Sequence, residues 1–141
     1  AALLGSTLAP HVDFFSIGTN DLTQYTLAAE RGNPQLYGFA DALHPAVLRL
    51  IQQVAESAHQ HGKWVGICGE LAGDPLATPI LAGLGIDELS LNPAGIPRVK
   101  SIVRNLDQEM VKPLVEEALK AESPEAVRQM AKTFMEKHHL L

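Results

Sequence analysis

The sequence predicts an α/β fold built on a parallel sheet, and three observations support that prediction. Short apolar stretches of strand length alternate with stretches in which apolar residues recur at helical spacing. The repeated order of strand and then helix returns the chain to the same end of a sheet, which makes the strands parallel. The 141 residues are 46% hydrophobic and 19% charged, an ordinary composition for a protein with one core.

The elements of the first half are bounded by residues that start or stop regular structure. Gly18 follows the first strand, Gly32 closes the first helix, and Pro45 suits the first turn of the second. That second helix is clearly amphipathic, because apolar residues recur along one of its faces. The predicted elements are a strand at 12–17, a helix at 21–30, a helix from His44 to Gly62 and a strand at 63–68.

The second half adds one strand and four helices. Asp74 and Pro75 are expected to cap the first of these helices, although Pro79 disturbs its regularity. The N-terminus of that helix would lie beside the thiol of Cys68 and would suit an anionic ligand. The predicted elements are a helix at 76–84, a strand at 87–91, and helices at 97–103, 107–121 and 124–138.

Three parallel strands predict an incomplete sheet, because such a sheet normally continues until its edges are covered. A barrel of eight strand-helix units needs about 250 residues. We therefore interpret residues 1–141 as a C-terminal fragment: the last three strand-helix units of a (β/α)8 TIM barrel, with a helical tail at 107–141 packed outside. The bare edges of such a part-barrel favour self-association, most simply as a homodimer.

Charge and cysteine content exclude several classes of function. The net charge is -5 and the pI is about 5.6, without a basic cluster, which argues against nucleic acid as a partner. A single cysteine excludes an internal disulfide and fits a reducing, cytoplasmic location. No apolar run approaches the roughly 18 residues of a membrane span, so no membrane partner is expected.

Cys68 lies where an apolar strand meets the glycine-rich segment 69–74. Parallel strands place their C-terminal ends together, and active groups in a barrel gather at those ends. A thiol there is a candidate catalytic group, and Gly69 and Gly73 would let the backbone approach a ligand closely. Two other interpretations stay open: a small buried hydrophobe, and, more weakly, a redox sensor without a resolving cysteine.

A second motif follows the first strand and is typical of a site for a metal and a phosphate. Asp21 offers a carboxylate ligand for Mg²⁺, Asn20 an amide donor, and Arg31 a guanidinium that grips oxyanions in two places. The structural alternative makes Thr19 or Asn20 a plain N-cap, Asp21 a first-turn partner of the helix dipole, and Arg31 a solvated cation.

The two motifs together resemble phosphoenolpyruvate-protein phosphotransferase, enzyme I of the bacterial sugar phosphotransferase system. The resemblance covers residues 12–104, and the tail beyond Leu106 carries no matching motif. The matching segments read Gly-Thr-Asn-Asp-Leu-Thr-Gln-Tyr at 18–25, Glu-Arg-Gly-Asn at 30–33, Cys-Gly-Glu-Leu-Ala-Gly-Asp at 68–74 and Ile-Pro-Arg at 96–98.

The resemblance implies a role for each matched residue. Asn20 and Asp21 would contact phosphoenolpyruvate, Asp21 would also bind Mg²⁺, and Arg31 would hold the phosphate. Cys68 would be the acid that protonates C3 of the enolpyruvate leaving group, a step that suits thiols, which are mostly protonated at neutral pH. The phosphoryl group would pass to a histidine of a separate domain, and a phosphocarrier protein would then deliver it to sugar uptake.

Two alternatives to this function stay open. Pyruvate phosphate dikinases and phosphoenolpyruvate synthases share part of the motifs, and a non-catalytic regulatory or dimerisation module would keep the part-barrel for assembly alone. The further metal carboxylate, further arginines and the acceptor histidine of the family would lie upstream, so we expect this chain alone to be inactive. We interpret its six histidines as helix-end or solvated residues. Arg98 is interpreted as a surface cation at the start of a helix.

Overall fold

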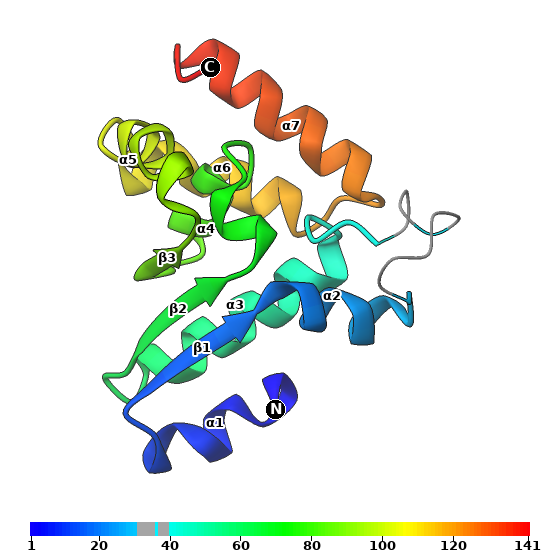
Figure 1. Ribbon diagram of the computed structural model, residues 1–141, viewed down its shortest axis with the longest axis vertical. Coiled ribbons are helices and arrows are strands. Elements are labelled where there is room, and N and C mark those ends of the chain that lie inside the picture. The colour runs from blue at the N-terminus through cyan, green and yellow to red at the C-terminus, as the bar shows by residue number, and fades with distance from the viewer. Residues whose placement is uncertain (31–35, 37–39) are drawn as a thin grey trace.

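A three-stranded parallel sheet lies at the centre of the computed structural model, which describes residues 1–30, 36 and 40–141 (Figure 1). The strand order is β1 (Phe14–Gly18), β2 (Trp64–Cys68) and β3 (Glu88–Ser90), and both pairings are parallel. The predicted parallel α/β fold is thereby confirmed. The register pairs Gly18 with Cys68 and Cys68 with Ser90, so the C-terminal ends of all three strands meet at one edge of the sheet.

The helices follow the predicted order, with boundaries that shift by a few residues. Residues 2–11 form short helical turns that the sequence pattern does not indicate, and α2 starts two residues earlier than predicted. The helical elements are η1 (Ala2–Leu4), α1 (Gly5–Leu8), η2 (Ala9–His11), α2 (Thr19–Leu27), α3 (Pro45–His59), η4 (Glu70–Gly73), α4 (Thr78–Gly83), η5 (Pro93–Gly95), α5 (Ile96–Val103), α6 (Gln108–Ala118) and α7 (Pro124–Lys137).

The sheet has one covered face and one open face. Ile17, Val65 and Ile67 are buried under the helices, and α3 runs behind β1 and β2 (Figure 1). The alternate residues of each strand point the other way, and among them Phe14 and Trp64 are 48% and 42% exposed. Cys68 belongs to this second set, so the thiol lies on the open face of the sheet.

The start of α3 agrees with the helix start predicted at His44 and Pro45. His44 is the N-cap residue, its Nδ1 accepts a hydrogen bond from the amide of Ala46 at 3.1 Å, and Pro45 occupies the first turn. The amphipathic pattern then buries one face of the helix against the sheet, with Val47, Leu48 and Ile51 fully covered.

The start of α4 differs from the prediction. Residues 75–77 form turns, because Asp74 Oδ1 accepts a hydrogen bond from the amide of Leu76 at 2.9 Å and the carbonyl of Asp74 accepts one from Thr78 Oγ1 at 3.1 Å. The helix therefore begins at Thr78, several residues beyond the thiol. The helix whose N-terminus follows directly on the paired strand end beside Cys68 is α2.

The tail helices lie outside the sheet (Figure 1). α6 packs on α4 so closely that a Cβ on Gly83 would lie 2.5 Å from Val115 Cγ2, and α7 packs on α6 (Figure 1). Arg49 Nε donates to the carbonyl of Leu119 at 2.9 Å, and an Arg98 guanidinium nitrogen donates to that of Leu140 at 2.7 Å. Arg98 thus anchors the C-terminal residues instead of facing the site. Within the described ranges, no helix is long and apolar enough to cross a membrane.

Candidate active site at the strand ends

Two hydrogen bonds join the two sequence motifs. Thr19 is fully buried, and its Oγ1 donates to the carbonyl of Cys68 at 3.0 Å. Asn20 Oδ1 accepts from the amide of Glu70 at 3.3 Å. The first turn of α2 therefore holds the strand end that carries the thiol and the turn that follows it.

The structure does not support the interpretation of Thr19 or Asn20 as a plain N-cap, because both side chains bond to the last residue of β2 or to the segment after it. The N-cap residue of α2 is Gly18, and neither side chain caps the helix. Because Asn20 uses its oxygen on Glu70, its amide nitrogen is the group that can donate to a substrate oxyanion.

Gly69 makes this close approach possible. Its backbone has φ of 103° and ψ of -172°, a conformation essentially restricted to glycine. A Cβ at this position would lie 2.8 Å from Thr19 Oγ1 and 3.1 Å from Asn20 Oδ1. The sequence predicted that glycine gives a ligand access here, but the nearby space is filled by the protein's own α2. At Gly73 a Cβ would make only ordinary contacts with Leu91.

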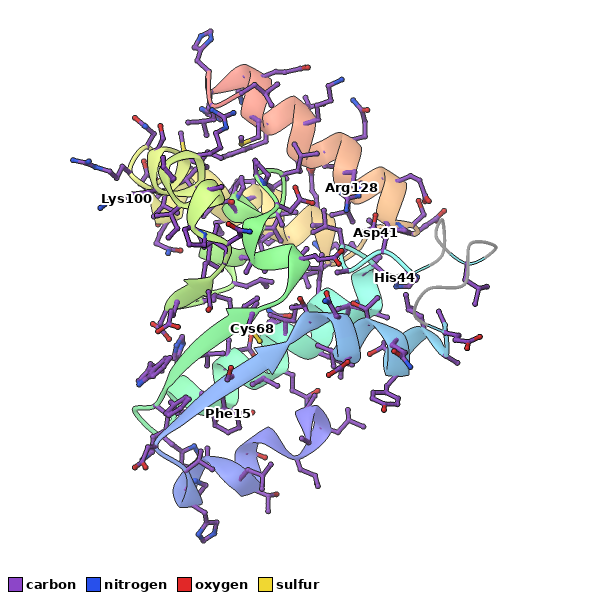
Figure 2. All side chains as sticks on the ribbon, in the orientation of Figure 1. Phe15, Asp41, His44, Cys68, Lys100 and Arg128 are labelled. Atoms are coloured by element: carbon purple, nitrogen blue, oxygen red, sulfur yellow. The ribbon has the colours of Figure 1, made fainter. Side chains whose placement is uncertain are left out.

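Cys68 lies at the C-terminal end of the central strand and is partly exposed (Figure 2). Its Sγ lies 3.7 Å from the carbonyl oxygen of Ile17, a weak hydrogen bond that orients the thiol along the neighbouring strand end. A side chain that is reachable from solvent and held at a strand end is suited to proton donation, whereas a buried core cysteine would be covered.

Asp21 lies in the first turn of α2 and is exposed. A Cβ on Gly18 would be 3.9 Å from its Oδ2, so the carboxylate sits over the end of β1. A hard, solvent-facing oxygen there fits the role of one Mg²⁺ ligand. In the described part of the chain, no group of three acidic, histidine or cysteine side chains could hold a metal ion.

Two further parts of the chain bear on this site: Arg31 and the segment that follows β3. Arg31, the expected phosphate ligand, lies outside the described residues. The segment after β3 forms the short helix η5 (Pro93–Gly95) with Asn92 as its cap, and Asn92 Oδ1 accepts a hydrogen bond from the amide of Ala94 at 3.1 Å.

Sequence reasoning missed a charged cluster that reaches the end of the 69–74 segment. Arg128 of α7 donates to Asp74 Oδ2 at 2.9 Å and, through two nitrogens, to both oxygens of Asp41. The hydrogen bond to Asp41 contributes most to raising the pKa of Arg128, partial burial opposes it, and the bond to Asp74 adds to it. The partners lie 87 and 54 residues from Arg128, so no local pattern could have revealed the cluster.

The sequence matches a family of known proteins. The family described as the PEP-binding domain of PEP-utilising enzymes matches residues 1–108. The chain is 53% identical over 128 residues to a multiphosphoryl transfer protein of Xanthomonas campestris, covering 91% of this chain and 15% of the relative. It is 47% identical over 135 residues to phosphoenolpyruvate-protein phosphotransferases of Haemophilus influenzae and Listeria monocytogenes, covering 96% and 95% of this chain but 24% and 23% of those proteins. The chain thus spans a quarter or less of the length of these relatives.

Proposed function

The chain belongs to the PEP-utilising enzymes, as part of their PEP-binding domain, and on this premise we propose that it is the phosphoenolpyruvate-binding part of a phosphoenolpyruvate-protein phosphotransferase. The proposed reaction moves the phosphoryl group of phosphoenolpyruvate to a protein histidine in another domain and releases pyruvate. A cytoplasmic phosphocarrier protein would take the phosphoryl group onward to sugar uptake. The names of the relatives favour this activity over that of a dikinase or synthase.

The observation that supports the proposal most strongly is that hydrogen bonds join the two sequence motifs. Thr19 and Asn20 hold the strand end and turn of Cys68, so a binding segment and an acid are fixed relative to one another. Phosphoryl transfer depends mainly on positioning and on charge neutralisation, which such a rigid junction favours. We further propose that the sheet continues into a TIM barrel, whose other strands would complete the site.

In this mechanism the chain's own residues have three tasks. The amide of Asn20 donates to an oxygen of the substrate, and Arg31 neutralises its phosphate. Asp21 would provide one ligand to Mg²⁺, which supplies charge neutralisation on the phosphate when bound. When the bond from phosphorus to the enol oxygen breaks, the Cys68 thiol gives its proton to C3, pyruvate forms, and water restores the proton to the thiolate.

The test uses a hybrid in which this chain replaces the matched 135-residue segment of the Haemophilus phosphotransferase. In that hybrid, Cys68→Ala should leave phosphoenolpyruvate affinity nearly unchanged while pyruvate formation falls by about 10²–10⁴-fold, the usual contribution of a positioned acid. The 141-residue chain alone should not turn over substrate, because the acceptor histidine and part of the site are then absent.

Ser16→Ala is a matched control, since Ser16 lies two residues before Gly18 in β1 and is exposed. Near-normal turnover of the folded Cys68→Ala hybrid would eliminate Cys68 as the acid. Lost affinity with little further loss at saturation would make it a binding residue instead. A hybrid without any turnover before mutation would contradict the proposed function itself.

A further inference from the structure

We propose that Arg128 is a positioning residue: it holds in place the turn that runs from Cys68 to Asp74. The inference rests on the proposed function, because it names what holds that same site in place. Arg128 comes from the tail helix α7, and its side chain lies beside Asp41 at the approach to α3 (Figure 2). Its contact with Asp74 reaches the far end of the turn.

The turn is held at both ends. At its start, the side chains of Thr19 and Asn20 bind the carbonyl of Cys68 and the amide of Glu70. At its end, Asp74 uses one carboxylate oxygen on the amide of Leu76 at 2.9 Å and the other on Arg128 at 2.9 Å.

Backbone hydrogen bonds transmit the position of Asp74 along the turn. The amide of Asp74 donates to the carbonyl of Leu71 at 3.2 Å, and that of Ala72 donates to the carbonyl of Gly69 at 3.3 Å. Leu71 and Ala72 are buried, so the short helix η4 moves as a packed unit. A displacement of Asp74 would therefore reach Gly69, the residue next to the thiol.

Only a forked cation can make this junction. The guanidinium binds both oxygens of Asp41 with two nitrogens and Asp74 with a third, whereas a lysine ammonium is a single point charge. The side chains of Asp41 and Asp74 are only 16% and 22% exposed. Without the arginine, two partly buried carboxylates would face each other and repel, which would push the end of the turn out of place.

The competing explanation is that Arg128 only attaches the tail to the rest of the chain. Two other arginines provide controls for this explanation. Arg49 and Arg98 also attach the tail, but each donates to a backbone carbonyl of the tail instead of to the turn. Arg49→Gln and Arg98→Gln each remove one positive charge and one tail contact while leaving Asp74 untouched.

The first experiment uses Cys68 as a reporter, because it is the only cysteine of the chain. The rate of its alkylation by iodoacetamide is measured for the 141-residue chain and its variants, with circular dichroism to establish folding. We expect Arg128→Lys and Asp74→Asn to raise this rate by about 3-fold or more, since the released turn exposes the thiol. Arg49→Gln and Arg98→Gln should leave it unchanged.

The second experiment measures kinetics in the hybrid enzyme. Asp74→Asn and Arg128→Lys should lower kcat by about 10-fold, as expected for a group that orients a catalytic residue, with little change in the KM for phosphoenolpyruvate. Asp74→Asn is the milder variant, because its amide oxygen can still accept from Leu76 and the pair of Arg128 and Asp41 remains.

If all four variants changed the alkylation rate of Cys68 and kcat equally, Arg128 would act only as an anchor of the tail. That result would overturn the inference. Unchanged thiol reactivity in folded Asp74→Asn and Arg128→Lys would overturn it as well. An inactive parent hybrid would contradict the proposed function, yet the alkylation rates would still decide whether Arg128 positions the turn.

Discussion

Gly69 shows how one residue without a side chain lets two distant segments meet. Thr19 and Asn20 occupy the space in which any Cβ at position 69 would lie. The sequence indicated a close approach at this glycine but could not say what approaches, because the approaching residues precede it by about fifty positions.

Gly69→Ala is predicted to destabilise the fold by about 1–3 kcal/mol, since the backbone conformation is strained for alanine and the new methyl group displaces Thr19. Thermal unfolding measures the loss, and alkylation of Cys68 should accelerate. Gly62→Ala is the matched control, because Gly62 also has a positive φ, of 66°, but its Cβ would meet nothing within 4 Å. Equal losses in the two variants would show that contact with α2 is not what Gly69 permits.

Asp87 joins three elements at the opposite end of the sheet from the candidate site. Asp87 lies just before β3. Its Oδ2 accepts a hydrogen bond at 2.9 Å from His59 Nε2, at the end of α3, and another at 2.8 Å from the amide of Val65, in β2. Burial acts to raise the pKa of Asp87, but the hydrogen bonds from His59 and Val65 and the charge of His59 together lower it below the ordinary value of 3.8.

A depressed carboxyl pKa stabilises the folded state above the pKa of the unfolded chain and stops doing so as the pH falls through the folded value. Asp87→Asn should therefore lower the melting temperature by about 1–4 °C at neutral pH, the usual size for a pair this exposed. The difference from the parent should shrink below about pH 4. Melting curves recorded from about pH 2.5 to about pH 7 provide the measurement. Asp13→Asn, at an exposed aspartate, is the control variant, and a gap that widens in acid for Asp87→Asn would contradict the assignment.

At the scale of the whole molecule, the open face of the sheet is the dominant feature. Phe14 and Trp64 are partners in the register, and their rings stack with centroids 4.5 Å apart and planes 7° apart. Both remain nearly half exposed at the end of the sheet opposite to Cys68. Exposed aromatic surface beside strand edges favours association with further protein.

We predict that the 141-residue chain self-associates, most simply as a dimer, through this open face. Light scattering across a dilution series measures the mass, and Trp64→Thr should shift the equilibrium toward the monomer because it removes the stacked ring. Val103→Thr, at an exposed apolar residue of α5, is the control. A well-folded parent that stays monomeric at every concentration would contradict the prediction.

Local patterns determined the α/β class, the order of the elements and the residues at the strand ends. Periodicity and caps act over a few residues, which is why α3 from Pro45 to His59 and β2 at Trp64–Cys68 agree closely with prediction. The same local signals misplaced the start of α4, because Asp74 caps an isolated turn with the same hydrogen bond that it would use to cap a helix.

Only the tertiary structure decided what touches Cys68 and its turn. Thr19, Asn20 and Arg128 reach that segment across about fifty residues or more, and such contacts depend on the register of the strands and the packing of the tail. Sequence determined which chemical groups this protein presents at its strand ends. Packing determined how they are held, because hydrogen bonds between distant segments leave no periodic trace in the chain.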